Sequence, residues 1–204
     1  MASGEVALGT ATVVPASAVE SGLVDECRRG DPQAFARLVA LHEGMVFNLA
    51  ARLLGDGEEA RDVSQDVFLQ VYRTLDRFQG RSTLKTWIYR IVVNHCRNRQ
   101  RWWRRRRRAA SVPLDTLRPA EEPQQPDGGP QEQLERRERA GTVQNALLKL
   151  SFDHRAILLL REVEGLSCRQ LTDALGIAEG TVKSRLSRAR EELRQRLAPQ
   201  ADKP

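Results

Sequence analysis

The sequence predicts an all-α protein built from two small helical domains joined by a flexible linker. Apolar residues recur at spacings of three and four along most of the chain, and no stretch sustains the two-residue alternation of a β-strand. A polar, proline-rich segment, residues 109–133, interrupts this pattern. At 204 residues the chain is long enough for one or two small domains with hydrophobic cores. We therefore expect domains at 27–108 and 134–198, with tails at 1–26 and 199–204.

Helix boundaries are clearly marked in the first domain. Asp31 followed by Pro32 is an N-cap with proline at the first helical position, and the apolar pattern behind it runs to Gly55. A second helical pattern begins near Glu58, and a third begins near Thr83. The first domain is therefore predicted to contain three helices.

Two segments are predicted to be disordered. Residues 1–26 are small and weakly apolar, and no basic start precedes an apolar run, so they do not resemble a signal peptide. Residues 109–133 hold five of the nine prolines and almost no large apolar side chains, so they cannot bury enough surface to offset the entropy of ordering. No run approaches the roughly 18 apolar residues of a transmembrane helix, so we expect no membrane insertion.

Residues 166–190 predict two short helices joined by a tight turn. Ser167 and Gln170 form a capping-box pattern, Gly176 stands where a helix end favours a left-handed residue, and Ala178 is a weak N-cap for the second helix. The face of the second helix opposite its apolar stripe, with its flanks, holds Gly180, Lys183, Ser184, Arg185, Ser187, Arg188 and Glu191. This layout is typical of a helix-turn-helix, whose second helix enters the DNA major groove. An amphipathic helical hairpin with a solvated basic face has the same periodicity.

A dense run of arginine ends the third predicted helix. The formal net charge is +6, no Lys or Arg precedes Arg28, and eight arginines fall between Arg97 and Arg108. At about 100° per residue, one polar stripe falls within an arc of about 80°: Thr86, Arg90, Asn94, Arg97, Arg101, Arg104 and Arg108. Such a stripe repels itself without an anionic partner, and Trp102 and Trp103 add rings that can stack on bases. We therefore favour nucleic-acid binding over a merely solvated face.

The residues give no sign of catalysis or of a cofactor. Cys27, Cys96 and Cys168 lie far apart without the spacing of a zinc site, which suits reduced thiols in a cytoplasmic protein. His95 and Cys96 are adjacent, so on a helix they point about 100° apart, and no second pair lies nearby. The chain contains no P-loop, HExxH or GxGxxG pattern. We expect no metal, no cofactor and no enzymatic activity.

Four segments together resemble the extracytoplasmic-function (ECF) sigma factors, the small alternative sigma subunits of bacterial RNA polymerase that keep only sigma regions 2 and 4. The segments are 60–68, 78–82, 86–94 and 159–190. A single helix-turn-helix is a weak signal, whereas both regions in this order with a linker between them are a strong one. The resemblance implies an alternative sigma factor that binds core RNA polymerase and directs promoter recognition and transcription initiation.

The resemblance also implies roles for three groups of residues. The group expected to open and hold the promoter −10 element is Phe78, Arg81, Ser82, Lys85, Arg90, Asn94, Arg97, Asn98 and Arg101. The group expected to contact the −35 element is Thr181, Lys183, Ser184, Arg185, Ser187 and Arg188. The group expected to dock on core polymerase is Asp62, Gln65, Asp66, Phe68 and Gln70. The implied partners are the β′ clamp and β flap of core RNA polymerase, promoter DNA and an anti-sigma factor.

Two further functions use parts of the same pattern. A stand-alone helix-turn-helix regulator would need a dimerisation element or a receiver domain, and neither is visible. An RNA-binding protein that used only the arginine-rich helix would leave residues 134–198 unexplained. Binding to core polymerase without DNA distinguishes the sigma-factor hypothesis from both.

Overall fold

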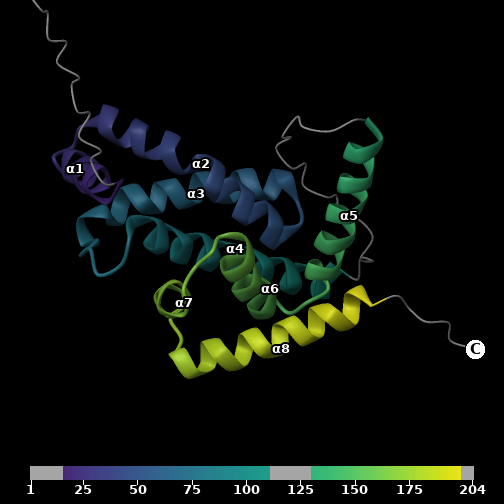
Figure 1. The fold of residues 1–204 in the computed structure, drawn as a ribbon. Coiled ribbons are helices and arrows are strands. Elements are labelled where there is room, and N and C mark those ends of the chain that lie inside the picture. Colours follow the sequence, from purple (N-terminus) through teal and green to yellow (C-terminus); the bar gives the residue numbers. More distant parts are fainter. Residues whose placement is uncertain (1–15, 111–129, 199–204) are drawn as a thin grey trace, which may run out of the picture.

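The structure is a computed structural model that describes residues 16–110 and 130–198, and these ranges contain helices and no strand (Figure 1). The prediction of an all-α protein is confirmed. The elements in chain order are α1 (Ala16–Arg28), α2 (Pro32–Leu54), α3 (Gly57–Thr74), the 3₁₀ turn η1 (Leu75–Arg77), α4 (Leu84–Ala110), α5 (Pro130–Leu148), α6 (Phe152–Leu158), the π-helical turn η2 (Leu159–Val163), α7 (Cys168–Leu175) and α8 (Glu179–Leu197). Across the described part of the chain, no helix combines the length and the apolar character needed to cross a membrane.

Side-chain caps define the ends of α2 and α3. The Asp31 carboxylate accepts the backbone N–H of Gln33 at 2.8 Å and starts α2 as predicted. Gly55 has φ 73° and ends α2 in the left-handed conformation. The next residue, Asp56, caps α3 by accepting the N–H of Glu58 at 2.9 Å. The chain can therefore reverse within two residues, which brings α3 back along α2.

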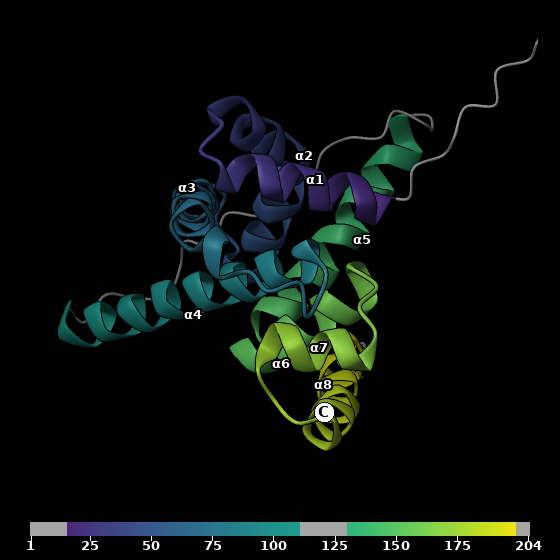
Figure 2. The same cartoon turned by 90° about the vertical axis from the view of Figure 1, so that its left-hand side faces the viewer.

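The helices α2, α3 and α4 lie side by side and form the larger packed group (Figure 1). Their apolar stripes face one another because each recurs at helical spacing. The buried residues on these stripes include Leu38, Val46, Leu49, Leu53, Val63, Val67, Val71, Ile88 and Val92. The C-terminal half of α4 projects beyond this body (Figure 2). Four of its arginines, Arg101, Arg104, Arg105 and Arg106, are exposed.

The helices α6, α7 and α8 form the second packed group. The stripe of α8 that packs on α6 and α7 comprises Val182, Leu186 and Ala189. The predicted capping box is present, since Ser167 and Gln170 exchange hydrogen bonds at the start of α7. Gly176, with φ 65°, ends α7, and Ala178 makes no side-chain cap to α8. The predicted helix-turn-helix therefore forms from local signals.

The prediction of a disordered N-terminal tail is wrong for residues 16–26. These residues form most of α1, which packs against α2 and η1. Leu23 and Val24 are buried in that contact. Tertiary packing stabilises a helix whose composition alone is too weakly apolar to indicate one.

The boundaries of the predicted linker also shift. Residues 109–110 belong to α4, and α5 begins at Pro130, so 130–133 are helical. The remainder of the predicted linker, residues 111–129, lies outside the described residues.

The two helical groups pack against each other and share one apolar core. α4 contacts α7, while α2 approaches α5 and α6. The fully buried Tyr89 of α4 donates its hydroxyl to the Glu164 carboxylate, which follows η2. Burial and this carboxylate both raise the pKa of Tyr89, so the hydroxyl stays a donor. Gln144 of α5 donates to the backbone carbonyl of Arg52 at 3.0 Å.

We expect Gly55→Ala to destabilise the protein and Gly141→Ala to stabilise it. A Cβ at Gly55 would sit in a left-handed backbone and 2.7 Å from Leu148 Cδ1, which costs at least about 1 kcal/mol. A Cβ at Gly141, inside α5, meets no atom within 4 Å, so the lower chain entropy of alanine adds about 0.5–1 kcal/mol. Urea unfolding of the full chain measures both changes. Equal stability of the two variants would contradict the close approach of α2 and α5.

Candidate nucleic-acid interface

The loop at residues 78–83 joins η1 to α4 and borders a hollow. Its first residue is held by a hydrogen bond from Phe78 N to Leu75 O at 3.0 Å, and the Phe78 ring lies 5.4 Å from the ring of Trp87. At its other end the Thr83 hydroxyl accepts the N–H of Thr86 at 3.1 Å and starts α4. Gly80, with φ 67°, makes the turn between these anchors. The loop is therefore fixed at both ends.

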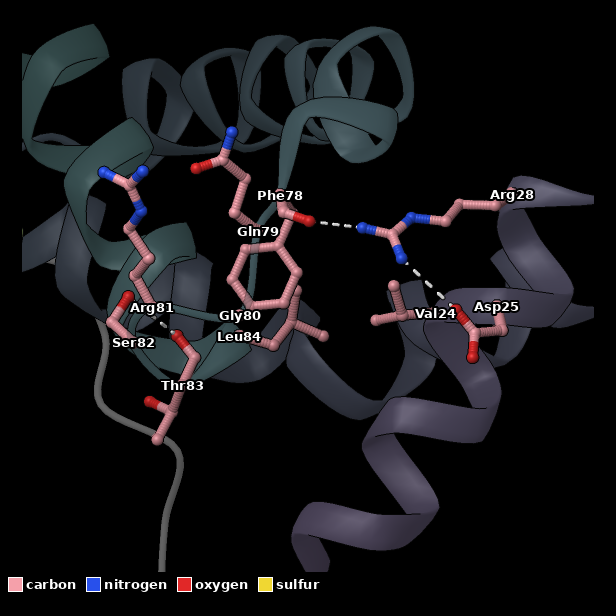
Figure 3. Close-up of a pocket in the computed structure, with 10 residues that line it drawn as sticks. All are labelled: Val24, Asp25, Arg28, Phe78, Gln79, Gly80, Arg81, Ser82, Thr83 and Leu84. Atoms are coloured by element: carbon pink, nitrogen blue, oxygen red, sulfur yellow. Dashed lines mark hydrogen bonds and ion pairs between the residues drawn. The ribbon is translucent and has the colours of Figure 1, made fainter.

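The hollow has a volume of about 660 Å³ and two kinds of wall (Figure 3). Volumes of about 300–1,000 Å³ are usual for pockets that bind small molecules. The residues lining it are Val24, Asp25, Arg28, Phe78, Gln79, Gly80, Arg81, Ser82, Thr83 and Leu84. The loop supplies hydroxyl, amide and guanidinium groups, while Val24, Phe78 and Leu84 supply apolar surface. A pocket of this kind suits a flat heterocycle with hydrogen-bonding edges.

Sequence reasoning missed the wall formed by α1. Arg28 reaches from α1 to the loop and donates to the backbone carbonyl of Phe78, and its other terminal nitrogen lies 3.2 Å from Asp25 Oδ1 (Figure 3). Assigning residues 1–26 to a disordered tail left Arg28 without a role. The one available signal was that Arg28 is the first basic residue of the chain.

The residues predicted to contact the −10 element lie on the loop and on α4. Arg90, Asn94 and Arg101 are exposed along one side of α4, close to the predicted stripe. Lys85 is exposed at the start of α4, with its ammonium 5.6 Å from the centre of the Tyr89 ring. Arg81 and Ser82 border the hollow together with Phe78, as Figure 3 shows.

Two polar positions of α4 differ from the predicted pattern. Thr86 is buried and hydrogen-bonded to Thr83, so it is unavailable as a surface contact. Asn98 lies in a smaller hollow of about 320 Å³ between α3 and α4, beside Asp66 and Trp102. Asn98 therefore faces the acidic side of α3 rather than the arginine stripe.

Asp153 of α6 joins an arginine from each predicted DNA-contact group. Its Oδ1 lies 3.1 Å from Arg97 Nη2 on α4, and its Oδ2 lies 3.9 Å from Arg185 Nη1 on α8. The guanidinium of Arg97 also lies 5.4 Å from the centre of the Phe152 ring. Both arginine side chains are about three-quarters buried. In this arrangement the Asp153 carboxylate pairs with both guanidinium groups, one from α4 and one from α8.

The rest of the predicted −35 group is exposed on α8. Thr181, Lys183, Ser184, Ser187 and Arg188 reach solvent on the face opposite the apolar stripe. Lys183 Nζ lies 2.9 Å from Glu179 Oε1, one turn earlier. That contact lowers the pKa of the Glu179 carboxyl and raises the pKa of Lys183, so both stay charged at neutral pH.

The predicted polymerase-docking residues all lie on α3, and all but Phe68 lie on one face of it. Asp62, Gln65 and Asp66 are exposed on one face, and Gln70 is half-buried beside them. Arg99 of α4 pairs with Asp62 at 3.3 Å and with Glu59 at 2.6 Å. We call Asp62, Gln65 and Asp66 the acidic face of α3. Phe68 lies off this face and packs against the apolar core, because the same helix needs it to cover the stripe beside Val67.

Arg155, which the sequence did not single out, is buried where α6 meets α4. Burial lowers its pKa to about 10, and burial raises the pKa of the neighbouring Cys96 thiol to about 12. Its Nη1 reaches the carbonyl of Leu148 at 3.4 Å, while Nε and Nη2 have no hydrogen-bond acceptor. A buried cation with two unpaired donors makes the contact between the helical groups costly.

Comparison with known proteins covers both helical groups. Residues 38–109 match the family model for Sigma-70 region 2, and residues 140–193 match that for Sigma-70, region 4. The RNA polymerase sigma-H factor of Pseudomonas aeruginosa is 35% identical over 185 residues, which cover 87% of this chain and 93% of that protein. The ECF RNA polymerase sigma factor SigW of Bacillus subtilis is 30% identical over 176 residues, covering 85% and 94%.

Solved structures show the same fold. The sigma factor RpoE of Bartonella quintana, in complex with the anti-sigma factor NepR, has a TM-score of 0.64 and 26% identity over 81% of this chain and 98% of that one. CnrH, in complex with the cytosolic domain of CnrY, has a TM-score of 0.60 and 27% identity, covering 88% and 97%. With both regions matched in order and relatives that align over almost their full length, the chain belongs to the ECF sigma factors of the sigma-70 family.

Proposed function

We propose that this protein binds core RNA polymerase and directs it to promoters with separate −10 and −35 elements. The observation that carries the proposal is that one chain holds two surfaces of different chemistry, each suited to a different form of DNA. The 78–83 loop borders an open pocket and leads into α4, which carries exposed arginines, while α8 presents a short-hydroxyl and cationic face. A pocket suits an unpaired base, and a helix face suits the major groove.

The surface formed by the 78–83 loop and α4 would take the −10 element. Flipping a base out of the stack costs a few kcal/mol, which stacking and hydrogen bonding inside a pocket offset. Arg90 and Arg101 are exposed on α4, the helix that follows the loop, and they would neutralise backbone phosphates along it. Asn94 offers an amide that can donate to and accept from a base edge. Asn98 is a weaker member of this group because it faces α3.

The exposed face of α8 would read the −35 element. Ser184 and Ser187 are short, so the helix can approach the groove closely, while Lys183 and Arg188 can reach guanine edges. Thr181 would contact the phosphate backbone near the start of the helix. Arg185 would do so only after it leaves Asp153.

The acidic face of α3 would dock on the β′ clamp, and the helices from α5 to α8 on the β flap. An exposed group of carboxylate and amide side chains complements a basic partner surface. Phe68 lies beside this face and packs against the core, so it would support the docking helix from within. The domain division at 27–108 and 134–198 belongs to this proposal, because each group would contact its own part of the polymerase and promoter.

Four further features complete the proposed role. The protein would act in the cytoplasm, where polymerase and promoter DNA are, and it would work by binding without catalysis of its own. An anti-sigma factor is the proposed regulator, because related sigma factors of known structure are bound to NepR and to the cytosolic domain of CnrY. The packed arrangement would open on promoter binding, because Arg97 and Arg185 share Asp153.

The first test is transcription by a reconstituted polymerase. We expect the full-length protein to enable core RNA polymerase from a related bacterium to start transcripts at discrete sites in a genomic promoter pool, as measured by sequencing of 5′ ends. The mapped starts should share two upstream elements. Core polymerase alone is the control, and no new starts relative to it would contradict the proposed function.

Arg188→Ala should weaken discrimination at the −35 element. An arginine that contacts a base edge contributes about 1–3 kcal/mol of sequence discrimination. Competition between promoter variants with single changes in the −35 element measures this effect with the reconstituted holoenzyme. Arg194→Ala removes the same charge from the far end of α8, where Arg194 pairs with Glu191 at 2.8 Å, and serves as the control. A uniform loss across all variants would show that Arg188 contacts only phosphate.

Asp153→Ala should strengthen promoter binding. The substitution frees Arg97 and Arg185 from a partly exposed ion pair, and pairs of this kind contribute up to about 1 kcal/mol, or roughly fivefold in affinity. Holoenzyme affinity for a mapped promoter measures the change. Asp173→Ala removes an acidic charge from α7 and is the matched control. If the two variants bind equally tightly, only net charge matters, and the shared ion pair does not compete with DNA.

A further inference from the structure

Helix α1 lies outside the segment that matches the Sigma-70 region 2 family model, which begins at residue 38. It nevertheless forms one wall of the pocket at the 78–83 loop. Val24, Asp25 and Arg28 line the hollow from the α1 side, and Leu23 and Val24 anchor the helix in the apolar core. The pocket is open on one side without this helix.

Arg28 connects the two walls. One terminal nitrogen of its guanidinium donates to the Phe78 carbonyl, and the other lies 3.2 Å from the Asp25 carboxylate (Figure 3). A guanidinium is planar and holds its donors in a fixed fork, so the two contacts set its position together. The Arg28 side chain is only 34% exposed, whereas that of Asp25 is 61% exposed. Arg28 therefore spans the rim of the pocket as an ordered link.

The loop depends on such a link for its shape. Between its anchors at Phe78 and Thr83 the chain turns at Gly80, which has a left-handed φ of 67°. A loop that is ordered before its ligand arrives loses less conformational entropy on binding. The Phe78 carbonyl that Arg28 holds belongs to the residue whose ring contacts Trp87. This residue is therefore held through both its backbone carbonyl and its ring.

We infer that α1 is part of the −10 site and that Arg28 is a positioning residue, which holds the 78–83 loop in the conformation that takes an unpaired promoter base. Arg28 acts through the loop, and Asp25 orients its guanidinium. This inference rests on the proposed function, since the base comes from promoter DNA that the holoenzyme opens.

The test compares Arg28→Ala, Arg28→Lys and Arg29→Ala in the reconstituted holoenzyme. Arg29 is exposed and carries the same charge at the next position. Two probes are used for each variant: a single-stranded oligonucleotide of the non-template −10 strand from a mapped promoter, with matched or mismatched bases, and a duplex that carries only the −35 element. Thermal unfolding of each full chain shows whether α1 remains packed.

Arg28→Ala should weaken binding of the matched −10 oligonucleotide by roughly tenfold or more, because a charge-assisted hydrogen bond is lost. It should also reduce the ratio of matched to mismatched affinity, which a general loss of positive charge does not change. Arg28→Lys should recover part of both, since an ammonium still donates to the carbonyl. Affinity for the −35 duplex should stay within about twofold for all three variants.

Two outcomes would overturn the inference while the proposed function stands. One is equal behaviour of Arg28→Ala and Arg29→Ala on the −10 oligonucleotide. The other is an equal loss on the −10 oligonucleotide and the −35 duplex. Absence of promoter-specific transcription by the wild-type holoenzyme would instead contradict the proposed function itself, so the two failures are distinguishable.

Discussion

The rest of the structure depends on the packing of α4. Its Ile88 and Val92 fill the core that α2 and α3 form, while Tyr89 reaches Glu164 in the second helical group. Because these apolar sides of α4 are buried, only its remaining side is exposed to solvent, and Arg90 and Arg101 lie there. The same helix thus joins the two groups and carries the exposed arginines of the surface that we propose binds DNA. The side of α4 on which a residue lies decides whether it is buried in the core or exposed to solvent.

The contact between the helical groups combines favourable and unfavourable terms. Apolar burial and the Tyr89–Glu164 hydrogen bond favour it, and the ion pair between Arg97 and Asp153 adds to it. Burial of Arg155 opposes it, because two of its nitrogens lack acceptors and its pKa falls to about 10. Opening this contact would free Arg97 for DNA and return Arg155 to water. A contact balanced in this way suits the proposed function, in which the two helical groups would act at separate promoter elements.

The site was predictable where a role follows from helical periodicity and was missed where it depends on a distant partner. The exposed face of α8 follows directly from the spacing of Val182, Leu186 and Ala189. The pairing of Arg97 with Asp153 joins residues 56 positions apart, and the link from Arg28 to Phe78 joins residues 50 positions apart. No local pattern contains such pairs. The docking group expected from the resemblance stays a prediction, and Phe68 within it packs partly against the core.

The sequence by itself determined the start and end of α2 and of α7, because caps and apolar stripes are local. Asp31, Gly55, Ser167 and Gly176 act on backbone groups within four residues of themselves, so their effect is readable without the fold. Only the tertiary structure decided that α1 exists and forms a wall of the pocket, and that Asp153 holds Arg97 and Arg185. Burial of Leu23 and Val24 stabilises α1 only when α2 and η1 are already in place. Side-chain charge is likewise local, whereas the partner that each charge meets is set by how the helices pack.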